Sequence, residues 1–277
     1  MGLRIATNIQ SLSAQRNLGI NSLAQKESLE HLSSGSRITK AADDAAGLAI
    51  SEKMKGQIRS VRQDVRNAND GISMIQTAEG GMNEVGNILT RFRELSIQSA
   101  SDTVGDVERG FMDREVQQLK LEVNRIAAST EFNGKKLLSG GSDRFEIQVG
   151  IGNNPNEDRF AFDANKANAT LEGLGVANIG VADKETARTN LDQIDSAVKT
   201  LVGNRAELGA LQNRLASTIN NLNIYNENLS AANSRIRDAD MASETADLAK
   251  NNILSQAGVS VLAQANQNNM MALKLLG

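Results

Sequence analysis

A heptad pattern of apolar residues near the C-terminal end is the feature that most constrains the fold. Between Leu191 and Ile236, seam positions recur in steps of three and four residues. A repeat sustained over this length is typical of a long helix that packs along another helix as a coiled coil. The chain must therefore supply a partner of matching length. The seam positions are Leu191, Ile194, Val198, Leu201, Arg205, Leu208, Leu211, Leu215, Thr218, Leu222, Tyr225, Leu229, Ala232 and Ile236.

The stretch from about Asp43 to Gln98 is predicted to be that partner. Its apolar residues lie mostly three or four positions apart, which places them on one stripe of a single helix. A continuous helix here would run for roughly 80 Å at about 1.5 Å per residue. If the chain ends meet, one helix runs out and the other runs back, so we expect an antiparallel pair. The stripe consists of Val61, Val65, Ala68, Ile72, Ile75, Met82, Val85, Leu89, Phe92 and Leu95.

Two further elements are predicted between the long helices. A shorter helix carries Met112, Val116, Leu119, Val123 and Ile126 in the same three-and-four spacing. An island from about residue 132 to 183 is not helical. In it Phe145, Ile147 and Val149 alternate with polar residues, and a Gly/Asn/Pro loop precedes Phe160 and Phe162. This pattern predicts a β-hairpin, which needs the helices behind it for stability.

The composition agrees with a helical protein and excludes several classes of function. The 277 residues include one proline (Pro155), no tryptophan, and only 3% aromatic side chains. A net charge of −3 gives no basic footprint for nucleic acid. There is no apolar run long enough to span a membrane, and we expect no cleaved secretory signal. The absence of cysteine excludes disulfides and thiolate chemistry.

Both chain ends carry helical patterns that differ from the middle of the chain. Residues 251–269 contain no charged side chain and are rich in Asn, Gln, Ala and Ser. A narrow apolar stripe on a helix without charges is unusual for the surface of a monomer. We therefore interpret both ends as surfaces that other copies of the chain cover. The predicted assembly residues are Ile5, Ile9 and Leu12 at the N-terminal end, and Ile253, Ala257, Val261 and Ala265 at the C-terminal end.

Several motifs of this sequence resemble those of the bacterial flagellin family. At the N-terminal end they are Ile5–Ile9, Leu32–Ile38, Ala42–Ser51, Asn67–Ser73, Thr77–Gly80 and Glu131–Leu138. At the C-terminal end they are Ser234–Ala242, Ala257, Gln264–Gln267 and the final Leu275-Leu276. The resemblance covers roughly residues 1–138 and 184–277, with the motifs in the family's order.

The resemblance implies a mainly α-helical fold with two domains. Residues 1–42 and 238–277 would form a terminal helical coiled-coil domain in the inner core of a filament. Residues 43–237 would form a long antiparallel helical rod that carries the hairpin. The large variable outer domains of many family members are expected to be absent, because the island is short.

The function implied by the resemblance is that of a structural subunit secreted to the extracellular bacterial flagellum, where it self-assembles for swimming motility. The implied partners are other copies of the chain, the flagellar export apparatus, an export chaperone, and cap and junction proteins. Two alternatives remain open, a hook–filament junction protein of the same family and an intracellular coiled-coil adaptor. Arg91, Leu95 and Glu115 match family positions bound by the flagellin-sensing Toll-like receptor of animals, although rod packing alone also explains these residues.

No catalytic, cofactor or metal site is predicted, so we expect the chain not to be an enzyme. His31 is the only histidine, which excludes a two-histidine zinc motif, and it is interpreted as a half-exposed helical residue. Asp43 and Asp44 are interpreted as acids that complement the dipole of the long helix from its first turn. Gly80-Gly81 inside the predicted helix has three interpretations, a tolerated flaw, a close approach of another helix, or a compliant point in a filament that must bend.

Overall fold

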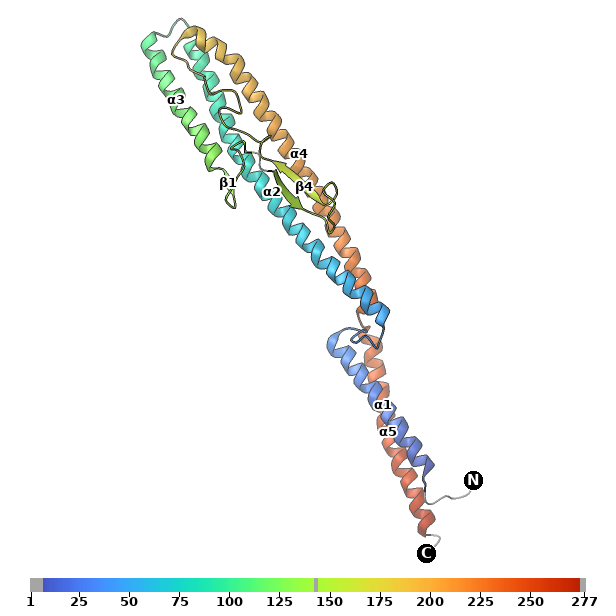
Figure 1. Cartoon of the computed structure of the whole chain (residues 1–277). Coiled ribbons are helices and arrows are strands. Elements are labelled where there is room, and N and C mark those ends of the chain that lie inside the picture. The colour runs from blue at the N-terminus through green and yellow to red at the C-terminus, as the bar shows by residue number, and fades with distance from the viewer. Residues whose placement is uncertain (1–6, 142–143, 275–277) are drawn as a thin grey trace. The chain divides into compact units, whose positions relative to one another are not determined.

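The computed structural model describes residues 7–141 and 144–274, and five α-helices dominate them. The helices are α1 (Ile9–Ser34), α2 (Ala45–Ser99), α3 (Asp106–Ser129), α4 (Lys184–Arg237) and α5 (Met241–Lys274). Four short strands form two hairpins, β1 (Glu131–Phe132) with β2 (Lys135–Lys136), and β3 (Arg144–Gln148) with β4 (Arg159–Asp163). The predicted mainly α-helical fold with a small β-hairpin is confirmed (Figure 1).

The chain divides into two compact units. Unit 1 contains residues 1–58 and 228–277, so both chain ends belong to it. Unit 2, the rod unit, contains residues 59–227. Helices α2 and α4 contribute residues to both units.

In the rod unit α2 and α4 run antiparallel, as the sequence predicts. Arg93 on α2 forms an ion pair with Asp195 on α4 at 2.8 Å, and Glu79 lies 3.4 Å from Arg205. Residue numbers rise along one helix and fall along the other, which fixes the direction of the pair. The predicted α2 stripe is buried or half-buried throughout, and its ring Phe92 is fully enclosed.

The heptad seam of α4 is enclosed at every predicted position except one. Ile194, Leu201, Leu208 and Leu215 are buried, and the other seam residues are half-buried. Tyr225, in contrast, is 42% exposed, so its predicted place in the seam is wrong. The position next to it, Asn226, is half-buried instead. A tyrosine hydroxyl is readily satisfied by water, which suits the exposed position.

Two glycines of α2 let other segments approach closely. A Cβ atom at Gly71 would lie 2.7 Å from Cδ1 of Ile147 on β3, so the glycine admits this side chain. A Cβ atom at Gly81 would lie 2.7 Å from both Thr130 Oγ1 and Leu138 Cδ1, whereas one at Gly80 would meet nothing within 4 Å. A close approach therefore exists at Gly81 and not at Gly80, and the segment that follows α3 makes it, instead of another helix as expected.

The predicted hairpin is present, and a second one was missed. Phe145 pairs with Phe162 and Ile147 pairs with Phe160 in the antiparallel register of β3 and β4. The short β1–β2 hairpin turns at Asn133 and Gly134, whose φ angles are 51° and 75°. Asn-Gly is the residue pair that such a turn favours, so the sequence did carry this signal.

Candidate assembly surface

Helices α1 and α5 of unit 1 pack side by side along a seam of mostly small and polar residues with a few leucines. The enclosed positions of α1 follow heptad spacing, and so do those of α5. Contacts pair the beginning of α1 with the end of α5, so the two helices are antiparallel. The seam residues are Ser11, Ala14, Leu18, Asn21, Gln25, Ser28 and Leu32 on α1, and Leu248, Asn251, Ser255, Gly258, Leu262 and Ala265 on α5.

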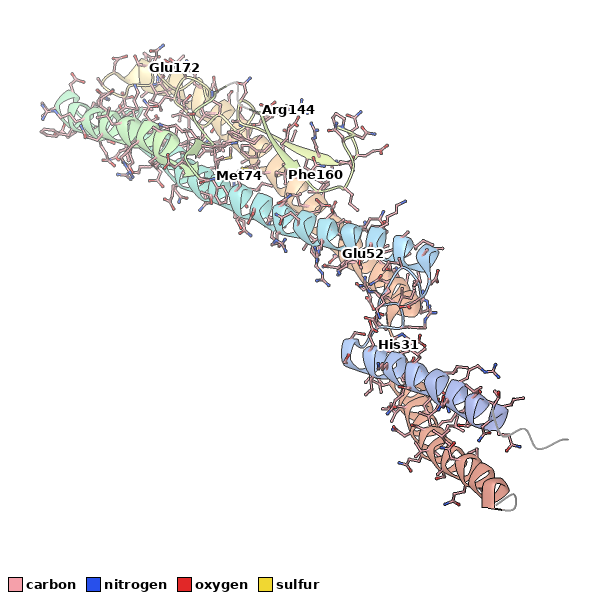
Figure 2. All side chains as sticks on the ribbon, turned by 60° about the horizontal axis from the view of Figure 1, so that its bottom comes forward. His31, Glu52, Met74, Arg144, Phe160 and Glu172 are labelled. Atoms are coloured by element: carbon pink, nitrogen blue, oxygen red, sulfur yellow. The ribbon has the colours of Figure 1, made fainter. Side chains whose placement is uncertain are left out.

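Side-chain hydrogen bonds link the α1 segment to α5 along this seam. The Asn8 Nδ2 atom donates to the Ala265 carbonyl at 3.0 Å, and Gln25 Nε2 donates to Asn252 Oδ1 at 2.6 Å. At the other end of the pair, the half-buried His31 (labelled in Figure 2) has its Nδ1 atom 3.0 Å from a carboxylate oxygen of Glu244. The seam is thus held by polar contacts and few aliphatic ones, which is a weak basis for an isolated helix pair.

Leu18 lies against Gly258 of α5 in the seam. A Cβ atom at Gly258 would lie 3.4 Å from Cδ1 of Leu18, which is an ordinary van der Waals distance. The contact therefore does not require a glycine. Leu18 is half-buried there, and it is one of the few aliphatic contacts between the two helices.

Most of the large aliphatic side chains of α1 and α5 face outward. A globular helix normally turns such residues toward its neighbour, so this arrangement is inverted. Exposed aliphatic residues gathered on one helix pair are typical of a surface that another molecule covers. The exposed residues are Ile9, Leu12, Ile20, Leu23 and Leu29 on α1, and Ile253, Leu254, Val259 and Val261 on α5.

The predicted assembly residues fall on two different faces. Ala265 is buried against α1, where its carbonyl accepts from Asn8, so it belongs to the seam and not to the outer face. Ile5 lies outside the described residues. The other five residues are exposed, and they are Ile9, Leu12, Ile253, Ala257 and Val261.

A short joint within unit 1 ties the end of α1 to the end of α4. Gly35 ends α1 with a φ angle of 67°, a conformation that a glycine adopts without strain. The Arg37 amide donates to the Arg237 carbonyl at 2.6 Å, and the Ala239 amide donates to the Gly35 carbonyl at 3.0 Å. Ile38, 1% exposed, anchors the joint. The chain segments that follow α1 and α4 are thereby fixed to one another.

The adjacent acids Asp43 and Asp44 both precede α2, instead of lying in its first turn as expected. Asp44 Oδ1 accepts from the Gly47 amide at 2.8 Å and so caps the start of the helix. Asp43 Oδ2 accepts from the amides of Lys40 and Thr39, each at 2.9 Å. These backbone bonds, that of Lys40 first, lower the pKa of Asp43. Both carboxylates thus organise the loop before α2.

Arg91 and Glu115 lie together on the surface of the rod unit, and Leu95 does not. Arg91 Nε donates to Glu115 Oε1 at 2.8 Å, joining α2 to α3, and Arg91 also pairs with Glu94 at 3.0 Å. The bond to Glu115, followed by that to Glu94, raises the pKa of Arg91. Leu95 is only 1% exposed and packs in the core. The three residues do not form one exposed patch in this conformation.

Sequence reasoning missed Arg109, which organises the loop between α2 and α3. This residue is buried, and its guanidinium donates to the carbonyls of Ser99 and Ser101, each at 3.0 Å. It also pairs with Asp106 at 2.7 Å. An arginine within the apolar spacing of α3 carries no periodic signal of its own, so only the structure identifies this role.

Two classes of site are absent from the part of the chain that the structure describes. None of its helices is long and apolar enough to cross a membrane. Residues 7–141 and 144–274 also contain no cluster of three or more His, Cys, Asp or Glu side chains suited to a metal ion. The aliphatic exterior of α1 and α5 is therefore the candidate functional surface.

Comparisons with known proteins agree with this geometry. Residues 5–143 match the bacterial flagellin N-terminal helical region, and residues 191–276 match the bacterial flagellin C-terminal helical region. A flagellin of Halalkalibacterium halodurans is 45% identical over 97% of this chain and 98% of its own length. The flagellar filament 33 kDa core protein of Treponema phagedenis is 42% identical, with the same coverage of both chains. The crystal structure of Bacillus cereus flagellin superposes with a TM-score of 0.50 at 29% identity, covering 57% of this chain and 88% of that one.

Proposed function

This chain belongs to the bacterial flagellin family, and from that premise we propose that it polymerises through the outward-facing aliphatic side chains of α1 and α5. It is a structural subunit of the flagellar filament, as its relatives named flagellin and filament core protein indicate. Those names favour a filament subunit over a junction protein or an intracellular adaptor. The observation that carries the proposal is the inverted helix pair, with mostly small and polar residues between the helices and most of the large aliphatic residues outside them.

The inverted pair gains its hydrophobic stabilisation only when copies come together. Burying a large aliphatic side chain completely contributes about 1.5–3 kcal/mol, and in a single copy the outer residues of α1 and α5 obtain little of this. We assign residues 1–42 and 238–277 to the inner core of the filament, where neighbouring copies cover these side chains. Residues 43–237 are assigned to the helical rod.

Order in the terminal helices should therefore depend on assembly. Fixing the backbone costs about 1–2 kcal/mol per residue, and the polar seam offsets little of that cost. Hydrogen exchange can compare the free subunit with the filament. The amides of α1 and α5 should exchange rapidly in the subunit and slowly in the filament, while the rod from Leu208 to Leu215 stays protected in both. Slow exchange of both terminal helices in the free subunit would contradict the proposal.

A polymerisation assay tests the function itself. The purified full-length chain, seeded with short filament fragments, should form tubes visible by electron microscopy. A chain that lacks residues 241–277 should remain dispersed, yet keep the circular dichroism of a helical rod. If the truncated chain forms tubes at the wild-type concentration, the terminal pair is not the assembly surface.

The family implies further partners along the route of assembly. Secretion through the flagellar export apparatus, delivery by an export chaperone, and contact with cap and junction proteins all follow from this proposed function. The polar α1–α5 seam supports such a route, because a weakly held helix pair is readily kept unfolded for passage through a narrow channel. The extracellular flagellum is accordingly the proposed location.

The Toll-like receptor of animals that senses flagellin is a proposed partner of the rod unit. Arg91 and Glu115 support it, since both are exposed and belong to one ion-pair network. Leu95 would act indirectly, by holding the core of the rod in place. Arg91→Glu should weaken binding of the free subunit by about 2 kcal/mol or more, the loss expected for a central arginine. Receptor activation by this variant at the wild-type dose would contradict the assignment.

A further inference from the structure

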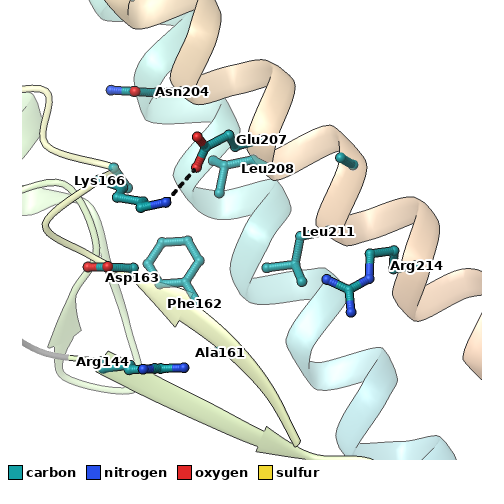
Figure 3. Close-up of a pocket in the computed structure, with 12 residues that line it drawn as sticks. Arg144, Ala161, Phe162, Asp163, Lys166, Asn204, Glu207, Leu208, Leu211 and Arg214 are labelled. Carbon is teal, nitrogen blue, oxygen red and sulfur yellow. Dashed lines mark ion pairs between the residues drawn. The ribbon is translucent and has the colours of Figure 1, made fainter. Parts of the chain in front are cut away.

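A hollow in the rod unit lies between β4 and the middle of α4 (Figure 3). Its volume is about 500 Å³. Phe162, Leu208 and Leu211 give it an apolar lining, and the first two are buried. Polar side chains from both elements and from the adjoining turn surround this lining.

Three cationic side chains line the hollow, Arg144, Lys166 and Arg214, against two acidic ones, Asp163 and Glu207. Lys166 pairs with Glu207 at 3.7 Å across the hollow. Arg214 lies over the Phe160 ring at 4.7 Å. Neither Arg214 nor Arg144 forms an ion pair within the described residues. The hollow is therefore suited to an apolar side chain flanked by an acid.

The outer face of α3 presents this combination. Val107, Phe111 and Leu121 are exposed there, and Phe111, at 59%, is the one exposed phenylalanine of the six in the chain. Glu108 lies one turn before Phe111 on the same helix, and it forms no ion pair with any residue that the structure describes. Arg114, one turn after Phe111, lies over the ring, and its Cζ atom is 5.6 Å from the ring centroid.

The α3 face therefore offers two groups that complement the hollow, an aromatic ring and an acid. The aromatic ring is an apolar group of the kind that the lining of Phe162, Leu208 and Leu211 accepts. Glu108 supplies an acid for Arg144 and Arg214, which form no ion pair with any residue that the structure describes. An acid that meets two arginines across a contact gives the complementary charges that fix the register of an interface.

The two surfaces of a single chain are too far apart to meet. The Arg91–Glu115 pair sets Glu115 level with Arg91, and the Arg93–Asp195 pair sets Arg93 level with Asp195. Phe111, one turn before Glu115, is therefore level with the part of α4 just before Asp195. The hollow lies further along α4, and at about 1.5 Å per residue the separation along the rod is about 25 Å.

We propose that Phe111 of one copy inserts into the hollow of a second copy, with Glu108 beside Arg144 and Arg214. This contact joins two different surfaces, so the first copy keeps a free hollow and the second copy keeps a free Phe111. Contacts of this kind propagate into open assemblies instead of closing as dimers. The inference rests on the proposed function, because it adds a rod-to-rod contact to the polymer that the terminal helices form.

Cysteine cross-linking tests the contact directly, because the natural chain contains no cysteine. Ala210 lines the hollow and is exposed. The double variant Phe111→Cys/Ala210→Cys, grown into filaments together with wild-type chain, should yield disulfide-linked oligomers after mild oxidation and denaturation. A disulfide requires Cα atoms within about 7 Å, so these links cannot arise inside one chain.

The matched control is Phe111→Cys/Val202→Cys, since Val202 is exposed on α4 but does not line the hollow. Its filaments should dissolve mainly to single chains. Separately, Phe111→Ser should raise the critical concentration for polymerisation about tenfold, which corresponds to about 1.4 kcal/mol per subunit. Val202→Ser should leave the critical concentration near the wild-type value.

The outcomes separate the two proposals. Filaments of the Phe111→Cys/Ala210→Cys variant without linked oligomers, or equal linking in the control, would overturn the rod contact and leave the proposed function intact. A wild-type chain that forms no filaments would overturn the proposed function, and the rod contact with it.

Discussion

Ile253→Ser isolates the contribution of the outer face of α5 to assembly. The residue is 67% exposed in the single copy, so the substitution removes few contacts there and should change subunit stability by no more than about 0.5 kcal/mol. If neighbouring copies cover the exposed two-thirds, the filament loses about 1–2 kcal/mol per subunit, from about 1.5–3 kcal/mol for a fully buried isoleucine. The critical concentration should then rise about 5- to 30-fold, at tenfold per 1.4 kcal/mol.

The assay is sedimentation of filaments grown at a series of subunit concentrations, with the unpolymerised fraction read as the critical concentration. Leu262→Ser is the matched control, because Leu262 is half-buried in the seam against α1. Leu262→Ser should speed hydrogen exchange of α1 and α5 in the filament, because it weakens the seam. Ile253→Ser leaves the seam intact and should not change this exchange. An unchanged critical concentration for Ile253→Ser would refute the argument that the outer aliphatic face drives assembly.

Three further sets of substitutions test the rod and the terminal pair. Gly80→Ala should stabilise the rod by about 0.5–1 kcal/mol in thermal unfolding, whereas Gly81→Ala should destabilise it by about 1–3 kcal/mol, because its Cβ atom meets Thr130 and Leu138. Burial, followed by the charge of nearby Asp158, raises the pKa of Asp64. In acid this carboxyl is protonated in both the folded and the unfolded chain and costs no stability, whereas it destabilises the rod as the pH rises through the raised pKa. Asp64→Asn should therefore stabilise the rod by about 1 kcal/mol at pH 7, and denaturant unfolding should show that gain vanishing below about pH 3.8. His31→Ala should leave filament formation and motility near wild type, because one pair with Glu244 contributes at most about 1 kcal/mol.

The rod could be predicted from the sequence because its periodic patterns are strong. The α2 stripe from Val61 to Leu95 is enclosed as expected, and the β3–β4 register follows the alternation of Phe145 and Ile147. Large aliphatic residues at regular spacing admit one buried face, so the pattern alone determines the packing.

The terminal pair could not be predicted to the same degree, because its packing face is not apolar. The spacing of Ile253, Ala257, Val261 and Ala265 suggested one stripe, yet Ala265 is buried and the other three are exposed. The seam uses small and polar residues such as Ser28, which give no hydropathy signal. Heptad spacing of the small residues is the sequence signal that predicts this seam.

The same inversion explains why a filament subunit tolerates so weak a helix pair. A pair with large aliphatic residues at every seam position would be more stable alone, and its exterior would then have less apolar surface for other copies. In the proposed assembly, most of the hydrophobic stabilisation of α1 and α5 is gained only when neighbouring copies cover their outer faces. Assembly and the ordering of the chain ends then become one cooperative step. The rod has a complete core in a single chain, so we expect it to stay folded before the chain ends are covered by other copies.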